Sequence, residues 1–232
     1  MNYNSIAPQY DAFERSAVTV WKLGYPAVCR FLGDPANRRI LDYGCGSGIF
    51  TRYLRDLKAQ VTGVDVSFEM IRVAQSVDGA GIDYRHIASG DLGFVPAATF
   101  DAAVVNFVLC TLPTHAEIRK ILDAIRRILK PGGSLVVMNS NWDRSNGKEF
   151  ISFRMDYSGE LIPGKPVTAT IKSDPPMPMR DFYWPNAEYL KMIRDAGFGI
   201  MATEEPLGRE DAIQWIDEKV FPPYLVIAAK KN

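Results

Sequence analysis

The sequence predicts an α/β protein whose central sheet is mostly parallel and is covered by helices on both faces. First, short apolar runs typical of strands alternate with stretches of helical periodicity between residues 36 and 139, which is the pattern of βαβ units. Second, these runs are apolar at nearly every position, as expected for parallel strands that are buried on both faces. Third, a glycine-rich turn follows the first run directly and leads into a helical stretch.

The elements of this core follow in chain order from the hydrophobic pattern. The expected strands and helices alternate as a strand at 39–42, a helix at 49–57, a strand at 61–65, a helix from 68 onward, strands at 82–87 and 100–106, a helix at 114–129 and a strand at 134–139. Ser67 is expected to cap the second helix at its N-terminus. Pro131-Gly132-Gly133 is expected to end the third helix, since proline and glycine commonly follow a helix C-terminus.

Two further segments flank this core. Residues 16–32 carry a mixed helical stripe within an N-terminal segment, 1–35. In 140–183, prolines interrupt strand-like pieces, and we expect a small β-rich insertion because so short a segment cannot build its own core. The C-terminal part, 184–232, is expected to complete the sheet with a helix at 186–196, a strand at 199–204, a short helix at 209–218 and a strand at 224–229. The whole chain, 1–232, is expected to form one domain around 36–139.

Composition narrows the function. Among 232 residues, 27 Lys+Arg balance 27 Asp+Glu, so the chain lacks the basic surplus typical of nucleic-acid binding. No apolar stretch approaches the roughly 18 residues of a membrane span, and the N-terminus lacks the pattern of a signal peptide. Cys29, Cys45 and Cys110 indicate neither a disulfide framework nor a metal site. We therefore expect a cytoplasmic protein without a metal, a membrane or a nucleic-acid partner.

The glycine-rich turn is the sharpest functional signal. Gly44, Gly46 and Gly48 lie between a strand and a helix, where the backbone turns tightly and approaches a ligand closely. Asp65 ends the next strand, 19 residues beyond Gly46, where an acidic side chain binds ribose hydroxyls in nucleotide-binding sheets. The third glycine comes one position too early for a dinucleotide fingerprint, and Asp42 before the turn favours a cationic ligand over a pyrophosphate. Both departures disfavour NAD.

The run from Asp42 to Gly48 resembles the first motif of the class I S-adenosylmethionine-dependent methyltransferases. Further segments resemble other motifs of that family: Phe100-Asp101, Leu129-Lys130-Pro131-Gly132-Gly133, Ala196-Gly197-Phe198 and the terminal strand. The resemblance implies a doubly wound, Rossmann-like sheet of seven strands with an antiparallel last strand. It also implies an N-terminal helical lid over residues 1–35, with S-adenosyl-L-methionine as cofactor and S-adenosyl-L-homocysteine as product.

The resemblance assigns the cofactor site residue by residue. The residues expected to bind the cofactor are Asp42, Gly44, Gly46, Gly48, Asp65, Val66, Met70, Ala88, Ser89, Asp91, Asn106 and Phe107. The family often has an acidic residue just after its third strand to bind the adenine amino group, whereas this chain has Ile87-Ala88-Ser89-Gly90-Asp91 there. Ser89, the backbone at Ala88 and the shifted Asp91 are therefore three alternatives for adenine.

The acceptor side rests on fewer signals. Tyr3, Tyr10 and Phe13 belong to the expected lid, and Tyr10 is the candidate for a hydroxyl near the methyl group. His115, which opens the helix after the fourth strand, is the candidate base, although a non-catalytic role at the helix N-terminus is the favoured alternative for it. Arg180 and Tyr183 in the aromatic-rich insertion are candidates for substrate contacts.

Several functions are compatible with these motifs. The favoured one is methyl transfer to a small molecule, with N-methylation slightly ahead of O-methylation because no persuasive general base stands out. The nearer alternative is a methyltransferase that acts on protein or RNA, which zero net charge disfavours. A third hypothesis is a non-catalytic cofactor-binding protein of the same fold. The fourth and least favoured is a nicotinamide-dependent reductase. The sequence assigns neither an acceptor nor an oligomeric state.

Overall fold

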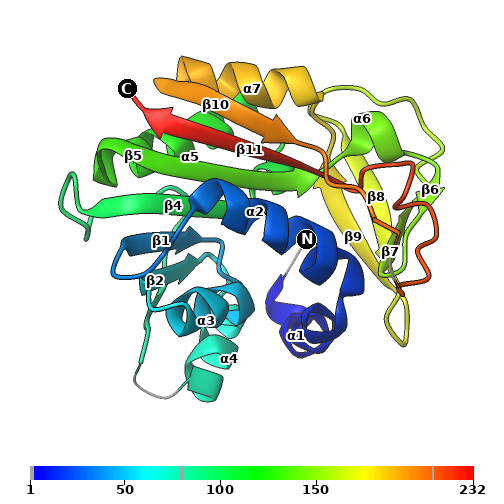
Figure 1. Cartoon of the computed structure of the whole chain (residues 1–232), viewed down its shortest axis with the longest axis horizontal. Helices are drawn as coiled ribbons and strands as arrows, with labels where there is room; N and C mark the ends of the chain where they lie inside the picture. Colours follow the sequence, from blue (N-terminus) through cyan, green and yellow to red (C-terminus); the bar gives the residue numbers. More distant parts are fainter. Residues whose placement is uncertain (1–2, 79–80, 211) are drawn as a thin grey trace.

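The computed structural model describes residues 3–78, 81–210 and 212–232. Within these ranges, seven strands form one sheet in the order β10-β11-β5-β4-β1-β2-β3. Strands β1 to β5 pair in parallel, whereas β11 runs antiparallel to both of its neighbours (Figure 1). This confirms the predicted fold. The strand bounds are β1 Arg39–Tyr43, β2 Gln60–Asp65, β3 Asp83–His86, β4 Phe100–Asn106, β5 Leu129–Ser140, β10 Phe198–Glu204 and β11 Tyr224–Lys231.

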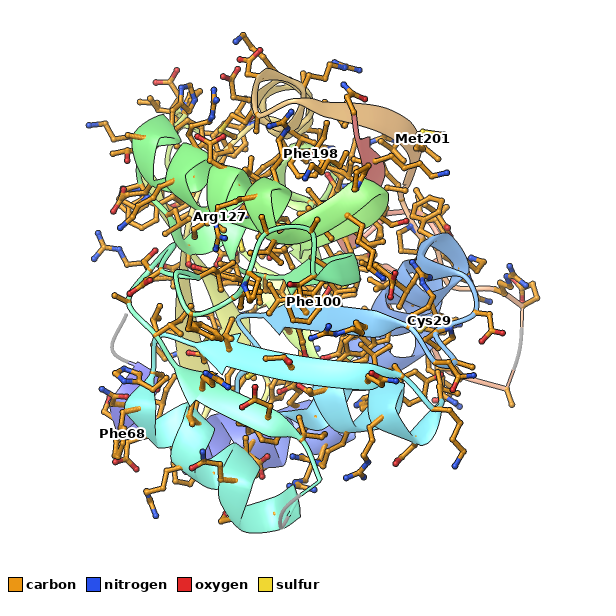
Figure 2. The ribbon with its side chains drawn as sticks, turned by 90° about the vertical axis from the view of Figure 1, so that its left-hand side faces the viewer. Cys29, Phe68, Phe100, Arg127, Phe198 and Met201 are labelled. Atoms are coloured by element: carbon orange, nitrogen blue, oxygen red, sulfur yellow. The ribbon has the colours of Figure 1, made fainter. Side chains whose placement is uncertain are left out.

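Helices cover both faces of the sheet, because successive strand residues point to opposite faces. Leu135 and Val137 of β5 belong to the hydrophobic cluster that contains α5 (His115–Ile128) and α7 (Asn186–Asp195). Val136 and Met138, one residue out of step, belong to the cluster that contains α2 (Tyr25–Leu32) and α3 (Ile49–Asp56). Helix α4 (Phe68–Asp78) packs in a smaller cluster beside β3. In Figure 2, Phe100 and Phe198 lie within the layers, while Phe68 and Met201 lie at the surface.

The N-terminal segment spans two distant parts of the molecule. It consists of a short 3-10 helix (Tyr3–Ser5), α1 (Ala7–Ser16) and a π-helical turn (Val20–Gly24) that continues into α2. On one side, the Asn4 side chain accepts hydrogen bonds from the Ser67 hydroxyl (2.7 Å) and the Glu69 backbone (3.2 Å) at the start of α4. On the other side, the Gln9 amide donates to the carbonyl oxygen of Pro175 (3.0 Å). Helix α1 therefore bridges α4 and the loop of a second sheet.

That second sheet stands at the end of the main sheet toward which β5 points (Figure 1). Its antiparallel strands are β6 Lys148–Glu149, β7 Phe153–Met155, β8 Pro166–Ile171 and β9 Met177–Phe182. A 3-10 helix (Leu109–Thr111) follows β4, and a short helix, α6 (Trp142–Ser145), joins β5 to this sheet. Phe153, Met155, Val167 and Ala169 pack in the same hydrophobic cluster as α2 and Tyr224 of β11, so the two sheets share one core.

Two local predictions are wrong. The described residues between β10 and β11 form turns and bends rather than the short helix expected at 209–218. The reason is Glu218, which is fully buried and accepts hydrogen bonds from the Thr19 hydroxyl (3.1 Å) and the Ile151 backbone (2.6 Å). The fifth strand, expected at 134–139, already begins at Leu129, because Leu129 pairs with Phe100 of β4; α5 ends at Ile128, shortly before Pro131-Gly132-Gly133 as predicted.

Among the described residues, no helix is long and apolar enough to cross a membrane. In the same ranges, no cluster of three or more His, Cys, Asp or Glu side chains has the arrangement of a metal site.

Candidate functional site

The carboxyl ends of β1, β2, β4 and β5 meet at one edge of the sheet, and a cavity of about 340 Å³ lies there. Ligands of open α/β sheets bind at this edge. Val66 lines the cavity and is 51% exposed, so the cavity opens to solvent beside the end of β2. Its lining combines four groups: the turn after β1, the ends of β2, β4 and β5, helix α1, and the second sheet.

The turn between β1 and α3 depends on its glycines. Gly44 has φ +78°, and a Cβ at this position would overlap the side chain of Val108. Gly46 has φ +53°, and a Cβ there would meet no other atom within 4 Å, so open space lies beside it. Backbone N–H groups of Gly44 and Cys45 both donate to the Val64 carbonyl oxygen (2.8 and 3.0 Å), which ties the turn to β2. Gly44 and Gly46 line the cavity; Gly48 is the N-cap of α3 beneath it.

Asp65 is fixed at the end of β2 by the turn itself. Its two carboxylate oxygens accept hydrogen bonds from the backbone N–H groups of Gly46 (2.9 Å) and Ser67 (2.7 Å). Burial raises the pKa of Asp65, while the backbone donors act in the opposite direction. A carboxylate has about four acceptor positions, and the backbone of Val66 is a third donor to Asp65, so a position remains for a hydroxyl donor from the cavity. Met70, Val66 and Ser89 line the cavity around it.

Asn106 and Phe107 end β4 at the centre of the cavity wall. Both polar atoms of the Asn106 side chain are buried, and neither has a hydrogen-bond partner among the described residues. A buried amide without a partner costs roughly 1–3 kcal/mol, which a bound ligand with polar groups would recover. Phe107 adopts φ +56°, a strained value for a residue with a side chain, and packs edge-on against Tyr224 at 5.3 Å.

Asp42 lies beneath the turn and does not line the cavity. It is 2% exposed, and Thr51 of α3 donates a hydrogen bond to its Oδ2 (2.6 Å). Burial raises the pKa of Asp42 from 3.8 to about 7, with a further contribution from the nearby charge of Asp65. Asp42 therefore links the end of β1 to α3 through Thr51 and does not contact a ligand in the cavity directly.

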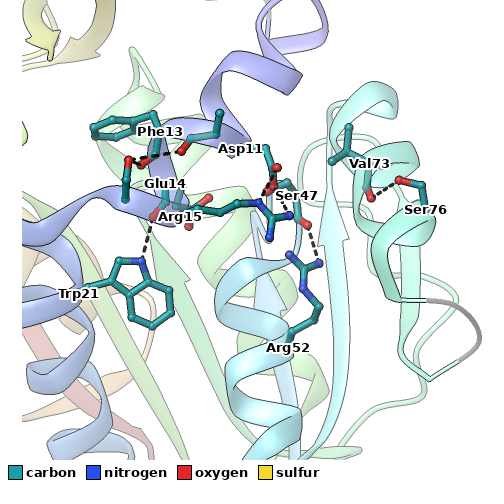
Figure 3. Close-up of polar contacts among 11 residues, drawn as sticks. Asp11, Phe13, Glu14, Arg15, Trp21, Ser47, Arg52, Val73 and Ser76 are labelled. Carbon is teal, nitrogen blue, oxygen red and sulfur yellow. Dashed lines mark hydrogen bonds and ion pairs between the residues drawn. The ribbon is translucent and has the colours of Figure 1, made fainter. Parts of the chain in front are cut away.

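Helix α1 forms the wall opposite the strand ends. Tyr10 and Phe13 line the cavity with ring centroids 6.2 Å apart, as does Glu14, which sequence reasoning missed. Glu14 Oε1 accepts a hydrogen bond from the Tyr25 hydroxyl (2.5 Å), and burial raises the Glu14 pKa to about 7. The signal was present in the sequence, since Tyr10, Phe13 and Glu14 share one helical face. Figure 3 shows Glu14 with Trp21, whose indole donates to the Glu14 carbonyl oxygen (2.8 Å).

The remaining wall belongs to the second sheet and the strands beside it. It is mostly apolar and consists of Phe153, Ala169, Ile171, Met179 and Tyr224, together with Ser140 and Asp181. Asp181 is 7% exposed, and burial raises its pKa to about 6. Sequence reasoning chose Arg180 instead of Asp181. Neighbouring residues of a strand point to opposite faces, so only one of the two can face the cavity.

Several predicted residues lie outside the cavity lining. His115 is 56% exposed, pairs with Glu188 of α7 (3.1 Å) and stacks near Trp184. The Tyr183 hydroxyl donates to Asp143 (2.7 Å), and the Arg180 guanidinium lies over Phe182. Ala88 and Asp91, both predicted to bind the cofactor, also lie outside the cavity lining. The side chain of Tyr3 lies outside the described residues.

Comparison with known proteins assigns the family. A family model described as a methyltransferase domain matches residues 41–137. N-demethylindolmycin N-methyltransferase of Streptomyces griseus is 32% identical over 204 residues, which cover 84% of this chain and 86% of that protein. The chain belongs to the class I S-adenosylmethionine-dependent methyltransferases. It is an enzyme of that type, and its cofactor is S-adenosylmethionine.

Other relatives of this methyltransferase match over different extents. A ubiquinone biosynthesis O-methyltransferase of Xanthomonas axonopodis pv. citri is 36% identical over 111 residues, covering 47% of this chain and 45% of that protein. A methyltransferase structure from Listeria monocytogenes has a TM-score of 0.66 at 20% identity and covers 90% of this chain and 96% of its own. The DhpI complex with S-adenosylhomocysteine has a TM-score of 0.65 at 20% identity, covering 99% and 93%. The two structures show the same fold.

The residues of the methyltransferase cavity fit this cofactor. The open space beside Gly46 admits a ligand close to the backbone, and Asp65 has an acceptor position left for a ribose hydroxyl. The unpartnered amide of Asn106 offers a donor and an acceptor to a charged amino acid group. The polar groups of Asp65 and Asn106 are thus compatible with two polar parts of S-adenosylmethionine, the ribose and the amino acid group.

Replacing the carboxylate at the end of β2 tests its assignment to ribose. We expect Asp65→Asn to weaken the binding of S-adenosylhomocysteine by roughly 1–3 kcal/mol, because the amide keeps one acceptor for the turn but loses the charge. Isothermal titration calorimetry measures the affinity. Asp143→Asn is the matched control, since Asp143 of α6 accepts from the Asn186 backbone (2.8 Å) outside the cavity lining. Unchanged affinity in Asp65→Asn would reject the assignment.

Asn106→Leu separates binding from stability. Leucine removes two buried polar atoms without partners, so we expect the Tm of the ligand-free protein to stay the same or rise. The affinity for S-adenosylhomocysteine should fall at least about tenfold, the equivalent of one lost hydrogen bond to a charged group. Differential scanning fluorimetry and calorimetry on the same sample measure both effects. A lower Tm with unchanged affinity would show that Asn106 is structural.

The buried carboxyl of Asp42 predicts a pH-dependent stability. Its pKa is about 7 in the folded protein, so folding favours the protonated form and stability falls as the pH rises from about 4 to about 7. Asparagine keeps an acceptor for Thr51 without a charge. We expect Asp42→Asn to exceed the wild type in unfolding free energy by on the order of 2–4 kcal/mol near pH 8 and by less than about 1 kcal/mol near pH 4. Urea unfolding at both pH values checks this; equal differences at the two values would contradict it.

Proposed function

We propose that this methyltransferase methylates a nitrogen of a small, largely apolar molecule that binds in the far half of the cavity. The observation that carries the proposal is the continuity of one cavity from the glycine turn to an apolar chamber between α1 and the second sheet. The chamber is lined by side chains of this chain rather than by an open, basic surface. That arrangement suits a small acceptor better than a polynucleotide.

The order of the strands separates the two halves. Asp65 ends β2 and the glycine turn follows β1, whereas Ser140 ends β5 and Tyr224 begins β11. Strands β2 and β5 are three steps apart in the sheet, which is about 14 Å at ~4.8 Å per step. The polar cofactor-binding residues thus occupy one half, and the apolar side chains of Phe153, Ile171 and Met179 occupy the other.

When bound, S-adenosylmethionine supplies a sulfonium methyl group as the electrophile. Asp65, the glycine turn and Asn106 would orient it, and α1 with the second sheet would orient the acceptor. Alignment of this kind contributes on the order of 7–11 kcal/mol to catalysis. The apolar chamber lowers the pKa of a bound amine and so favours its nucleophilic, neutral form. Glu14 and Asp181 are the carboxyl groups of the cavity, besides Asp65, that can take up the amine's proton.

Two relatives support small-molecule acceptors and differ in the atom methylated. The protein from Streptomyces griseus, which matches over most of both chains, is an N-methyltransferase by name. The O-methyltransferase from Xanthomonas matches over less than half of either chain. O-methylation is the second candidate, and the observation in its favour is Glu14, whose pKa of about 7 suits a general base for a hydroxyl.

A matched pair of acceptors tests the proposal. Tryptamine and tryptophol share one planar apolar skeleton and differ in carrying an amine or a hydroxyl. The enzyme with S-adenosylmethionine should add one or more methyl groups to the amine, as measured by mass spectrometry, and Asn106→Leu should be impaired at equal cofactor concentration. Methylation of the hydroxyl alone would favour O-methylation. If S-adenosylmethionine with a labelled methyl group labels only protein or RNA in a cell lysate, the acceptor is a macromolecule. If the protein binds the cofactor but transfers no methyl group, it is non-catalytic.

A further inference from the structure

Asp181 is a buried carboxylate in the acceptor half of the cavity. It belongs to β9 of the second sheet, is 7% exposed and lines the cavity. Ser140 at the end of β5 donates a hydrogen bond from its hydroxyl to Asp181 Oδ2 (3.0 Å), and the Trp142 indole donates to the same oxygen (3.4 Å). The thiol of Cys110 donates a third hydrogen bond to this carboxylate. Asp181 is thus fixed from three separate elements: β5, α6 and the 3-10 helix that follows β4.

The donors around Asp181 are all neutral. A hydroxyl, an indole N–H and a thiol leave the charge uncompensated, and no ion pair joins Asp181 to a cation in the part of the chain that the structure describes. Burial of a carboxylate without a cation is costly, and here it raises the pKa to about 6, so the group is still largely ionised near neutral pH. A carboxylate also has about four acceptor positions, one more than the three donors occupy. The Asp181 carboxylate therefore has a negative charge without a cation beside it and one hydrogen-bond acceptor position that is still free.

The second cavity carboxyl, Glu14, does not share this environment. Tyr25 donates to it directly, and its charged neighbours are Asp42, Asp11 and Arg52, which lie at the α3 side of the cavity. That side adjoins the glycine turn. Asp181 has Ser140 and Trp142 as partners instead, at and just beyond the end of β5. The two carboxyls thus have different neighbours, and Asp181 lies on the second sheet.

We propose that the Asp181 carboxylate binds the nitrogen of the methyl acceptor, and that it selects acceptors with a basic amine over those with a hydroxyl. The inference rests on the proposed function, because it assigns a residue to the acceptor half of the same cavity. An acceptor that enters as an ammonium ion pairs with the carboxylate and gives it one proton. The nitrogen lone pair then forms the bond to the methyl carbon as the bond from that carbon to sulfur breaks. The bonding pair stays on sulfur, the positive charge passes to the methylated nitrogen, and the proton on Asp181 leaves to solvent.

The test compares Asp181→Asn with the wild type in acceptor binding, turnover and cofactor binding. The amide preserves the shape and the bonds from Ser140 and Trp142 but removes the charge. With tryptamine as acceptor, we expect kcat/KM to fall about 100-fold or more, as for loss of one partner of a buried charge pair. Calorimetric titration of tryptamine into the complex with S-adenosylhomocysteine should show the same loss of affinity. Affinity for S-adenosylhomocysteine itself should change less than about twofold.

Asp143→Asn is the matched control. Asp143 is an exposed carboxylate on α6 that accepts from the Tyr183 hydroxyl (2.7 Å) and the Asn186 backbone (2.8 Å), outside the cavity lining. The Asp143→Asn variant should bind and methylate tryptamine as the wild type does. A second variant, Ser140→Ala, keeps the charge but removes one of its three donors, and should raise KM for tryptamine several-fold with kcat less affected.

The outcomes separate this inference from the proposed function. If Asp181→Asn binds and methylates tryptamine as well as the wild type does, the inference is overturned while small-molecule methyl transfer stands. If the wild type methylates tryptophol in preference to tryptamine, Asp181 does not select amines. If no small acceptor is methylated, the proposed function fails. Titration of tryptamine into the complex with S-adenosylhomocysteine then still decides the inference: binding that depends on Asp181 supports it, and binding that does not, or no binding, overturns it.

Discussion

The site depends on the hydrogen bonds that tie the turn after β1 to the end of β2. The Val64 carbonyl oxygen accepts from two successive backbone N–H groups of that turn, and Asp65 accepts from a third, that of Gly46. Three bonds to adjacent residues fix the turn's conformation, and the positive φ angles at Gly44 and Gly46 make it possible. The same bonds fix the Asp65 carboxylate. Because turn and carboxylate hold each other, both are fixed in a single arrangement before any ligand binds.

Much of this half could be predicted from the sequence, because its signals are local. The strand pattern, the glycine spacing and Asp65 all fall within one βαβ unit, and Ser67 caps α4 as expected by accepting from the Met70 backbone (3.2 Å). The acceptor half could not be predicted in the same way. Asp181 depends on Ser140, which is 41 positions away, and on the direction of one strand. Arg180 was predicted as the arginine of the aromatic-rich insertion, whereas its neighbour Asp181 lines the cavity. The failed helix at 209–218 reflects long-range bonds to Glu218.

Buried carboxyl groups give the site a cost in stability that function explains. Glu14, Asp42 and Asp181 all have pKa values raised by burial, so each ionises less readily in the folded protein than in water. Their partners are mainly neutral donors: a phenol, an alcohol and an indole. Neutral donors satisfy the oxygens but leave the charge in place. Glu14 and Asp181 line the cavity, where a ligand that carries a positive charge would compensate them, whereas Asp42 lies beneath the glycine turn.

The two halves of the cavity also differ in how the chain assembles them, and this bears on specificity. Residues that surround the cofactor half are contributed mainly by β1, β2 and β4, close together in sequence, and they lie within the region matched by the family model, residues 41–137. The acceptor half joins α1 to a sheet whose strands lie at 148–182, through contacts such as that of Gln9 with Pro175, which are 166 positions apart. Changes in either distant segment alter the acceptor chamber without touching the glycine turn or Asp65. Acceptor choice can therefore vary while the cofactor-binding half stays the same, and the charge of Asp181 on β9 is the feature that we propose to set it in this protein.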